Sequence, residues 1–129
     1  MPRLLIIQAT GYRYRGVREP YKLRKRKLVG AVLPHLAALA PREWEVTLLD
    51  DATEEVDYDA PVDAVAITIR TVTSLRGYEI ADRFRYRGIP VLMGGPHTTF
   101  HYEEVSRHAD AVCIGEAEDV FPRMLADAA

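Results

Sequence analysis

Cysteine is almost absent from this sequence, since Cys113 is the only one among 129 residues. A single cysteine excludes a disulfide framework within the chain and agrees with a reducing compartment. Long apolar runs are also absent, because no stretch approaches the ~20 apolar residues that a membrane-spanning helix needs. The short apolar run that begins at Leu4 leads into a basic segment and does not have the form of a signal peptide. Length and composition therefore predict one cytoplasmic domain over residues 1–129, with no membrane partner.

Acidic residues are nearly missing from residues 11–30, which hold eight basic residues and one acid, Glu19. The rest of the chain has nine basic and eighteen acidic residues, so the net charge is −2. A basic stretch in an acidic protein can bind a phosphate, an acidic partner or nucleic acid, or it can be the solvated start of a helix. No recognised nucleic-acid motif accompanies it, so we do not expect nucleic acid as a partner.

Five short segments that we predict as strands alternate with segments of helical periodicity. The predicted strands are residues 4–7, 45–50, 63–69, 89–93 and 110–114, and the helical segments are residues 23–40, 74–87, 102–108 and the stretch that starts near Glu118. This alternation predicts an α/β fold with a doubly wound, five-stranded parallel sheet, Rossmann-like or flavodoxin-like, in the order 2-1-3-4-5. Within the helices, we expect Leu75 on the buried face of residues 74–87 and Pro122 in the first turn of the last helix.

The candidate site is formed by the segments that follow the strands. Gly94 and Gly95 come directly after an apolar run, where they permit either a tight turn or the close approach of a ligand to the backbone. A second turn of this kind, residues 115–118, follows the next strand. Open α/β folds bind ligands at the carboxyl ends of strands, near the switch between strands 1 and 3. We therefore expect these turns to meet residues 10–14 and 70–74 at one edge of the sheet.

Several ligand-binding motifs of such folds are missing. Residues 10–16 read TGYRYRG, which fits neither the G-x-G-x-x-G of dinucleotide-binding folds nor a P-loop. A phosphorelay receiver would need an aspartate after the third strand and a lysine after the fifth, where this chain has residues 68–70 (TIR) and Gly115. The loop rich in Arg and Tyr also differs from the Ser/Thr/Gly phosphate loop of flavodoxins.

One family fits the turns. Residues 94–99 (GGPHTT) followed by residues 109–118 (ADAVCIGEAE) resemble the N-terminal cobalamin-binding domain of cobalamin-dependent radical-SAM enzymes. Further matches to the same domain are residues 67–71, residues 78–82 and residues 48–50. The resemblance covers most of the chain. It implies a module of, or a carrier for, a radical-SAM enzyme of the methyltransferase type.

The resemblance also implies a binding mode. The corrin would lie over the carboxyl edge of the sheet, with its nucleotide tail beside the Gly94–Gly95 turn and with residues 12–14 lining its lower face. The implied cofactor-binding residues are Thr10, Gly11, Tyr12, Arg13, Tyr14, Thr68, Arg70, Thr71, Ser74, Gly94, Gly95, Pro96, His97, Gly115, Glu116 and Glu118. Glu116 and Glu118 have an alternative explanation, because acids at a helix N-terminus are favoured by the helix dipole. We expect no catalytic residue and no metal ligand, since His97 lies on the tail side.

A motif of other cobalamin domains is missing. Domains of the mutase and methionine-synthase type carry D-x-H-x-x-G after the first strand, and its histidine ligates cobalt. Aligning Gly16 with the last glycine puts Gly11 at the aspartate position and Arg13 at the histidine position. A guanidinium stays protonated and offers no lone pair to a metal. We therefore expect no histidine ligand from this loop, which agrees with the radical-SAM branch.

The catalytic centre of radical-SAM enzymes is missing too. Their cluster needs C-x-x-x-C-x-x-C, and this chain has only Cys113. S-adenosylmethionine and the 4Fe–4S cluster would thus belong to a catalytic domain in cis or in trans, and the isolated chain would not be catalytic. Two alternatives stay open. One is a degenerate flavodoxin-like interaction domain, and the other is binding of an acidic partner or nucleic acid through residues 13–27.

Overall fold

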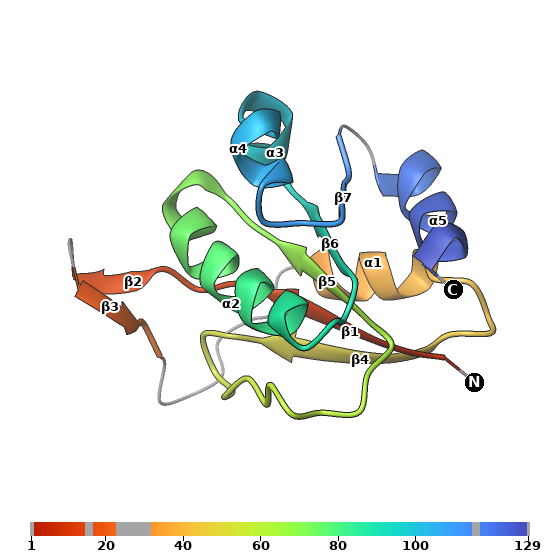
Figure 1. The fold of residues 1–129 in the computed structure, drawn as a ribbon, viewed down its shortest axis with the longest axis horizontal. Helices are drawn as coiled ribbons and strands as arrows, with labels where there is room; N and C mark the ends of the chain where they lie inside the picture. The colour runs from red at the N-terminus through yellow and green to blue at the C-terminus, as the bar shows by residue number, and fades with distance from the viewer. Residues whose placement is uncertain (1, 15–16, 23–31, 115–116, 129) are drawn as a thin grey trace.

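The computed structural model describes residues 2–14, 17–22, 32–114 and 117–128. Five strands form a parallel sheet: β1 (Arg3–Gln8), β4 (Glu45–Asp50), β5 (Ala64–Thr68), β6 (Val91–Gly94) and β7 (Ala111–Val112). They lie in the order β4-β1-β5-β6-β7 (Figure 1). If only these five strands are numbered, in the order in which they occur along the chain, the order in the sheet is 2-1-3-4-5. The predicted α/β fold is therefore confirmed.

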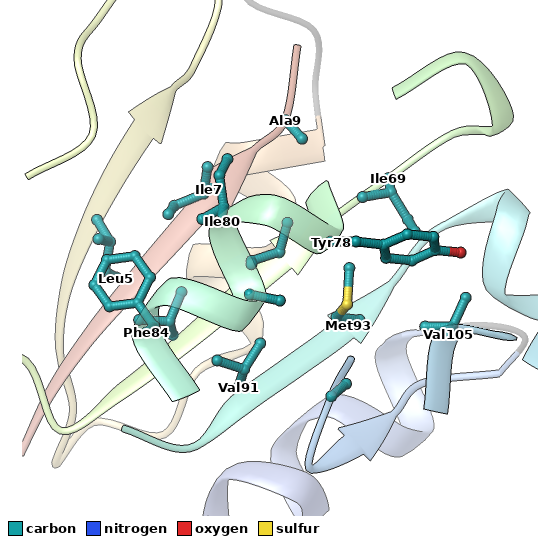
Figure 2. Packing of buried hydrophobic residues seen from close by; sticks show 14 of the residues in the cluster. Leu5, Ile7, Ala9, Ile69, Tyr78, Ile80, Phe84, Val91, Met93 and Val105 are labelled. Atoms are coloured by element: carbon teal, nitrogen blue, oxygen red, sulfur yellow. The ribbon is translucent and has the colours of Figure 1, made fainter. Parts of the chain in front are cut away.

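Helices cover both faces of this sheet. They are α1 (Val32–Leu39), α2 (Ser74–Tyr86), α3 (Pro96–Phe100), α4 (Tyr102–Ser106) and α5 (Ala117–Ala128), and a 3₁₀ turn η1 (Thr71–Thr73) precedes α2. Ile7 of β1 belongs to a core with Phe84 of α2 (Figure 2). Ile6, which points to the other face, belongs to a core with Leu33 of α1 and Phe121 of α5. Both faces are buried, which explains why the strand is apolar at successive positions.

The segment after β1 differs from the prediction of an irregular loop. Tyr12–Tyr14 (β2) and Val17–Pro20 (β3) pair as an antiparallel hairpin that extends beyond the sheet (Figure 1). Its only sequence signal is the alternation of Tyr12 and Tyr14 around a basic residue. A period of two over three residues is too short to separate a strand from a loop.

Three smaller expectations were wrong or incomplete. Leu75 is 65% exposed, because the buried face of α2 runs through Tyr78, Ala81 and Phe84 without it. Pro122 lies inside α5 and not in its first turn, because the helix begins at Ala117. The expected helix over residues 23–40 is described only from Val32 onward. Among the helices of the described ranges, none is long and apolar enough to cross a bilayer.

Candidate functional site

The segments that follow β1, β5 and β6 begin side by side at the carboxyl edge of the sheet. The backbone N–H of Ala9 donates to the carbonyl of Thr68 at 3.3 Å, and the N–H of Ile69 donates to the carbonyl of Gly94 at 2.9 Å. The turn after β5 also meets the start of the hairpin, since Tyr12 Oη donates to the Leu75 carbonyl at 3.4 Å. Of the four segments that the sequence predicted to meet, the structure thus brings together residues 10–14, residues 70–74 and the Gly94–Gly95 turn (Figure 1), while residues 115 and 116 of the fourth lie outside the described residues.

Apolar side chains are open to water at this edge. Val72 in the turn after β5 is 76% exposed, and Leu75 beside it is 65% exposed. Phe100 at the end of α3 and Ile114 after β7 are exposed as well. Because exposed apolar groups that lie together mark binding surfaces, Val72 and Leu75 make the start of α2 a candidate surface for a ligand or a partner.

The protein's own packing requires Gly95 and favours a small residue at position 94. Gly95 has φ +112°, and a Cβ placed on it would lie 2.2 Å from the carbonyl oxygen of Ile69. A Cβ on Gly94 would lie 3.3 Å from the Cβ of Cys113. The turn therefore runs close against the ends of the neighbouring strands. This close approach accounts for both glycines without a ligand.

Three predicted site residues are buried and use their polar groups inside the protein. The hydroxyl of Thr10 donates to the Tyr21 carbonyl at 2.9 Å. The hydroxyl of Ser74 donates to the Thr71 carbonyl at 2.9 Å. His97 is 4% exposed, and its ring contacts Tyr78, Glu104 and Thr71. These contacts anchor the turns within the protein.

The remaining predicted residues divide into two groups. Exposed or half-buried at the edge are Gly11, Tyr12, Thr68, Arg70, Thr71, Gly94, Gly95 and Pro96. Gly115 and Glu116 lie outside the described residues, and the side chains of Arg13, Tyr14 and Glu118 are not described either.

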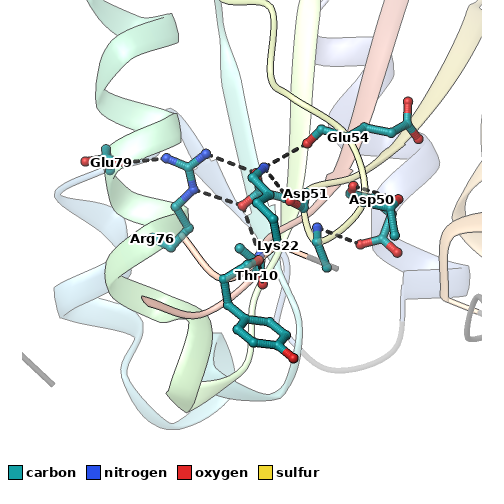
Figure 3. Close-up of polar contacts among 10 residues, drawn as sticks. Thr10, Lys22, Asp50, Asp51, Glu54, Arg76 and Glu79 are labelled. Carbon is teal, nitrogen blue, oxygen red and sulfur yellow. Dashed lines mark hydrogen bonds and ion pairs between the residues drawn. The ribbon is translucent and has the colours of Figure 1, made fainter. Parts of the chain in front are cut away.

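A buried ion network below this edge was missed from the sequence (Figure 3). Asp51, which follows β4, is fully buried, and its carboxylate accepts from Arg76 Nε at 2.9 Å and Nη2 at 3.0 Å. Lys22 Nζ lies 2.8 Å from the same carboxylate, and the N–H of Thr10 donates to it at 3.1 Å. The network fastens the segments on both sides of the hairpin, residues 10 and 22, to β4 and α2. One available signal was Arg76, which lies four residues before the buried Ile80 on the same helical face.

The electrostatics of this network favour ionised Asp51. Burial by itself would raise the pKa of this carboxyl, but hydrogen bonds from Arg76, Lys22 and Thr10 outweigh it and hold the pKa below the ordinary value of 3.8. The ionised form is therefore the form that stabilises the fold.

Acid should remove this stabilisation. The pKa of Asp51 is lower in the folded than in the unfolded chain, so its contribution is complete at neutral pH and is lost as the pH falls through the folded-state value. We expect the free energy of unfolding, measured with urea, to fall between about pH 5 and pH 2. Asp51→Asn should show a shallower fall over this range. An equally steep fall in both proteins would mean that other carboxylates carry the acid sensitivity.

Comparison with known proteins gives one family and two relatives. A family model described as "B12 binding domain" matches residues 31–125, a range that starts after the hairpin. The bacteriochlorophyllide d C-8(2)-methyltransferase of Chlorobaculum tepidum is 39% identical over 106 residues, covering 81% of this chain and 24% of the relative. The bacteriochlorophyllide d C-12(1)-methyltransferase of the same organism is 38% identical over 95 residues, covering 71% of this chain and 21% of the relative. The chain spans about a quarter or less of the length of these curated relatives.

Proposed function

The chain belongs to the B12-binding domain family, and from this premise we propose that it binds cobalamin at the carboxyl edge of its sheet. The family match over residues 31–125 carries the proposal, because this range includes the turns after β5 and β6. The exposed residues of the edge fit the ligand. A corrin has apolar ring faces and amide side chains at its rim, and here Val72 and Leu75 are exposed next to the polar Arg70 and Thr71.

The binding mode follows from the two sides of this edge. We assign the nucleotide tail to the Gly94–Gly95 turn, with the turn at residues 115–118 beside it. We assign the lower corrin face to Tyr12, Arg13 and Tyr14 of the hairpin. The contact of Tyr12 with the Leu75 carbonyl supports this, because it holds the hairpin against the exposed apolar residues of the turn after β5. Side chains that are buried and already bonded, such as Ser74 and His97, position these turns.

Cobalt would have no histidine ligand from the hairpin, because residues 11–16 contain no histidine. Its lower position would hold water, a weak ligand or nothing.

Methyl transfer would need a catalytic domain in addition to this chain. Bound cobalamin supplies a cobalt centre that carries a methyl group, and the protein supplies placement and surroundings. The two relatives are named as methyltransferases, and the chain matches at most about a quarter of either. We propose that a radical-SAM domain, in cis or in trans, holds the 4Fe–4S cluster and S-adenosylmethionine, since this chain has a single cysteine.

The alternative of an acidic partner gains no support from the described residues. Most of residues 13–27 lie outside them or lack a described side chain. Of the eight basic residues in this region, Lys22 is committed to Asp51 and to the Glu54 carbonyl at 2.8 Å.

Binding of hydroxocobalamin tests the proposal. We expect one corrin per chain to co-elute with the apo-protein in gel filtration and to be visible by absorbance. Val72→Asp should weaken binding about tenfold or more, because the ring would cover an unpaired carboxylate. Tyr86→Asp is the matched control, since Tyr86 is 93% exposed at the far end of α2 and should bind as the parent does.

Two outcomes would contradict the proposal that cobalamin binds at this edge. If the folded chain never retains the corrin, the family's fold is present without its ligand binding. If the Val72 variant binds cobalamin as well as the parent, the corrin does not cover Val72 and the binding site lies elsewhere. Spin resonance of the cobalt(II) form of bound cobalamin, compared between unlabelled and ¹⁵N-labelled protein, checks the lower ligand. A nitrogen splitting that changes with the protein's label would refute the absence of a protein nitrogen on cobalt.

A further inference from the structure

Two histidines and a glutamate converge at the corner between α3 and α4. One potential ligand atom from each of His97, His101 and Glu104 lies within 4.8 Å of the others. We propose that these three residues bind a divalent transition-metal ion of the Zn²⁺ class, at a site separate from the cobalt of any bound cobalamin. The proposal does not depend on corrin binding.

The local fold explains the convergence. His97 and His101 are four residues apart, and Glu104 follows three residues later, a spacing that keeps all three on one helical face. The chain bends at His101, with φ −131° and ψ 43°, where α3 ends and α4 begins. The bend keeps its helical hydrogen bonds, because the N–H of His101 donates to the His97 carbonyl and the N–H of Val105 donates to the His101 carbonyl, each at 3.0 Å.

The surroundings of His97 resemble those of a metal-bound imidazole. Its Nδ1 lies 3.3 Å from Thr71 Oγ1, while its Nε2 lies 2.9 Å from Glu104 Oε2. Metal-binding histidines commonly use one ring nitrogen for an outer hydrogen bond that fixes the ring and the other for the ion. Tyr78 Oη donates to Glu104 Oε2 at 2.6 Å, so the carboxylate has an outer partner as well. A bound ion would replace the contacts of His97 Nε2 with Tyr78 and with Glu104 and would leave the Tyr78–Glu104 bond in place.

Charge and access also suit a cation. Glu104 supplies a carboxylate, which brings the negative charge that a cation needs. His97 is buried, whereas His101 and Glu104 are exposed, so an ion can enter from solvent. Two imidazole nitrogens and one carboxylate oxygen suit Zn²⁺ and neighbouring metals, and three protein ligands leave a position for water. The ion would fasten α4 to α3 next to the Gly95 turn.

Titration of the tag-free apo-chain with Zn²⁺, followed by calorimetry, tests the site. We expect one ion per chain. His101→Ala and Glu104→Gln should each bind at least about tenfold more weakly, and both residues are exposed, so neither change should unfold the protein. The matched controls His35→Ala, on α1, and Glu103→Gln, next to Glu104, should bind as the parent does.

Two further measurements separate a built site from surface binding. Co²⁺ bound in place of Zn²⁺ should give visible absorption bands of a low-coordinate ion, and His101→Ala should remove them. Tyr78→Phe should weaken Zn²⁺ binding about 10–100-fold, because it removes the outer partner of Glu104. Absence of Zn²⁺ binding by the folded chain, or equal binding by the His101 and Glu104 variants, would overturn the proposal. Hydroxocobalamin binding by the same variants would show that such a failure leaves the corrin site untouched.

Discussion

Gly95→Ala is expected to lower the free energy of unfolding by about 4 kcal/mol or more. Two costs add at this position. The backbone has φ +112°, which a residue with a Cβ rarely adopts, and the new Cβ would lie 2.2 Å from the Ile69 carbonyl oxygen. That oxygen belongs to the backbone just after β5, so it cannot move without disturbing the sheet. Single domains are stable by about 5–15 kcal/mol, so much of the stability would be lost.

Substitutions at two other glycines measure the cost of backbone strain and the cost of steric overlap separately. Gly88, after α2, has φ +79°, but no atom lies within 4 Å of the place that a Cβ would take, so Gly88→Ala should cost only about 1–2 kcal/mol of backbone strain. Gly94 is not among the glycines with positive φ, and its Cβ would meet Cys113 at 3.3 Å, so Gly94→Ala should cost about 1 kcal/mol of overpacking. Urea unfolding of the three variants measures the order. Equal costs for all three would show that the turn after β6 shifts to relieve both the strain and the overlap.

The large expected destabilisation by Gly95 substitutions makes them unsuitable as tests of corrin binding. A Gly95 variant that fails to retain cobalamin would report a damaged fold and not the loss of a ligand contact. Val72→Asp is more informative, because Val72 is 76% exposed and its side chain contributes little to the core.

The arrangement of the sheet was predictable from the sequence because the strands β1, β5 and β6 contain continuous apolar runs. Residues 63–69 were predicted as a strand, and β5 spans Ala64–Thr68. The edge that carries the site was predictable for the same reason, since parallel strands place their carboxyl ends together. The hairpin was not, because Tyr12 and Tyr14 pair with residues on a strand of mixed polarity and give no apolar run.

The contacts within the site were less predictable than its location. The sequence could not tell whether Gly94 and Gly95 face a ligand or a neighbouring strand, because both need the same absence of a side chain. Asp51 and Arg76 are 25 residues apart, and no local pattern marks a pair that forms only when β4 and α2 are packed together. The contact of Tyr78 with His97 was missed similarly, because the two side chains come from different helices.

The second large effect is expected at Asp51. Asp51→Asn removes the charge that pairs with Arg76, whose side chain is also buried, and should lower the free energy of unfolding by about 3–5 kcal/mol. The cost arises mainly from the buried guanidinium, which keeps its ion pair with Glu79 but loses the two hydrogen bonds that it donates to Asp51. Asp50→Asn is the matched control. Asp50 is only partly buried and accepts from the N–H of Ala52 at 3.0 Å, a contact that an asparagine oxygen can keep, so its change should be small.

Replacing both Asp51 and Arg76 by apolar residues tests whether the buried guanidinium causes the loss of stability. If the buried charge of Arg76 dominates, Asp51→Leu combined with Arg76→Met should be less destabilised than Asp51→Asn, because two apolar side chains replace the buried pair and the partly exposed Glu79 can turn to solvent. Lys22 can then turn to solvent, since its side chain is only partly buried. If the double variant is as unstable as Asp51→Asn, the network matters through its shape, as the carboxylate that also holds Thr10 and Lys22. Cleavage by trypsin after Lys22 would then rise in both variants, because both release the segment that joins the hairpin to the sheet.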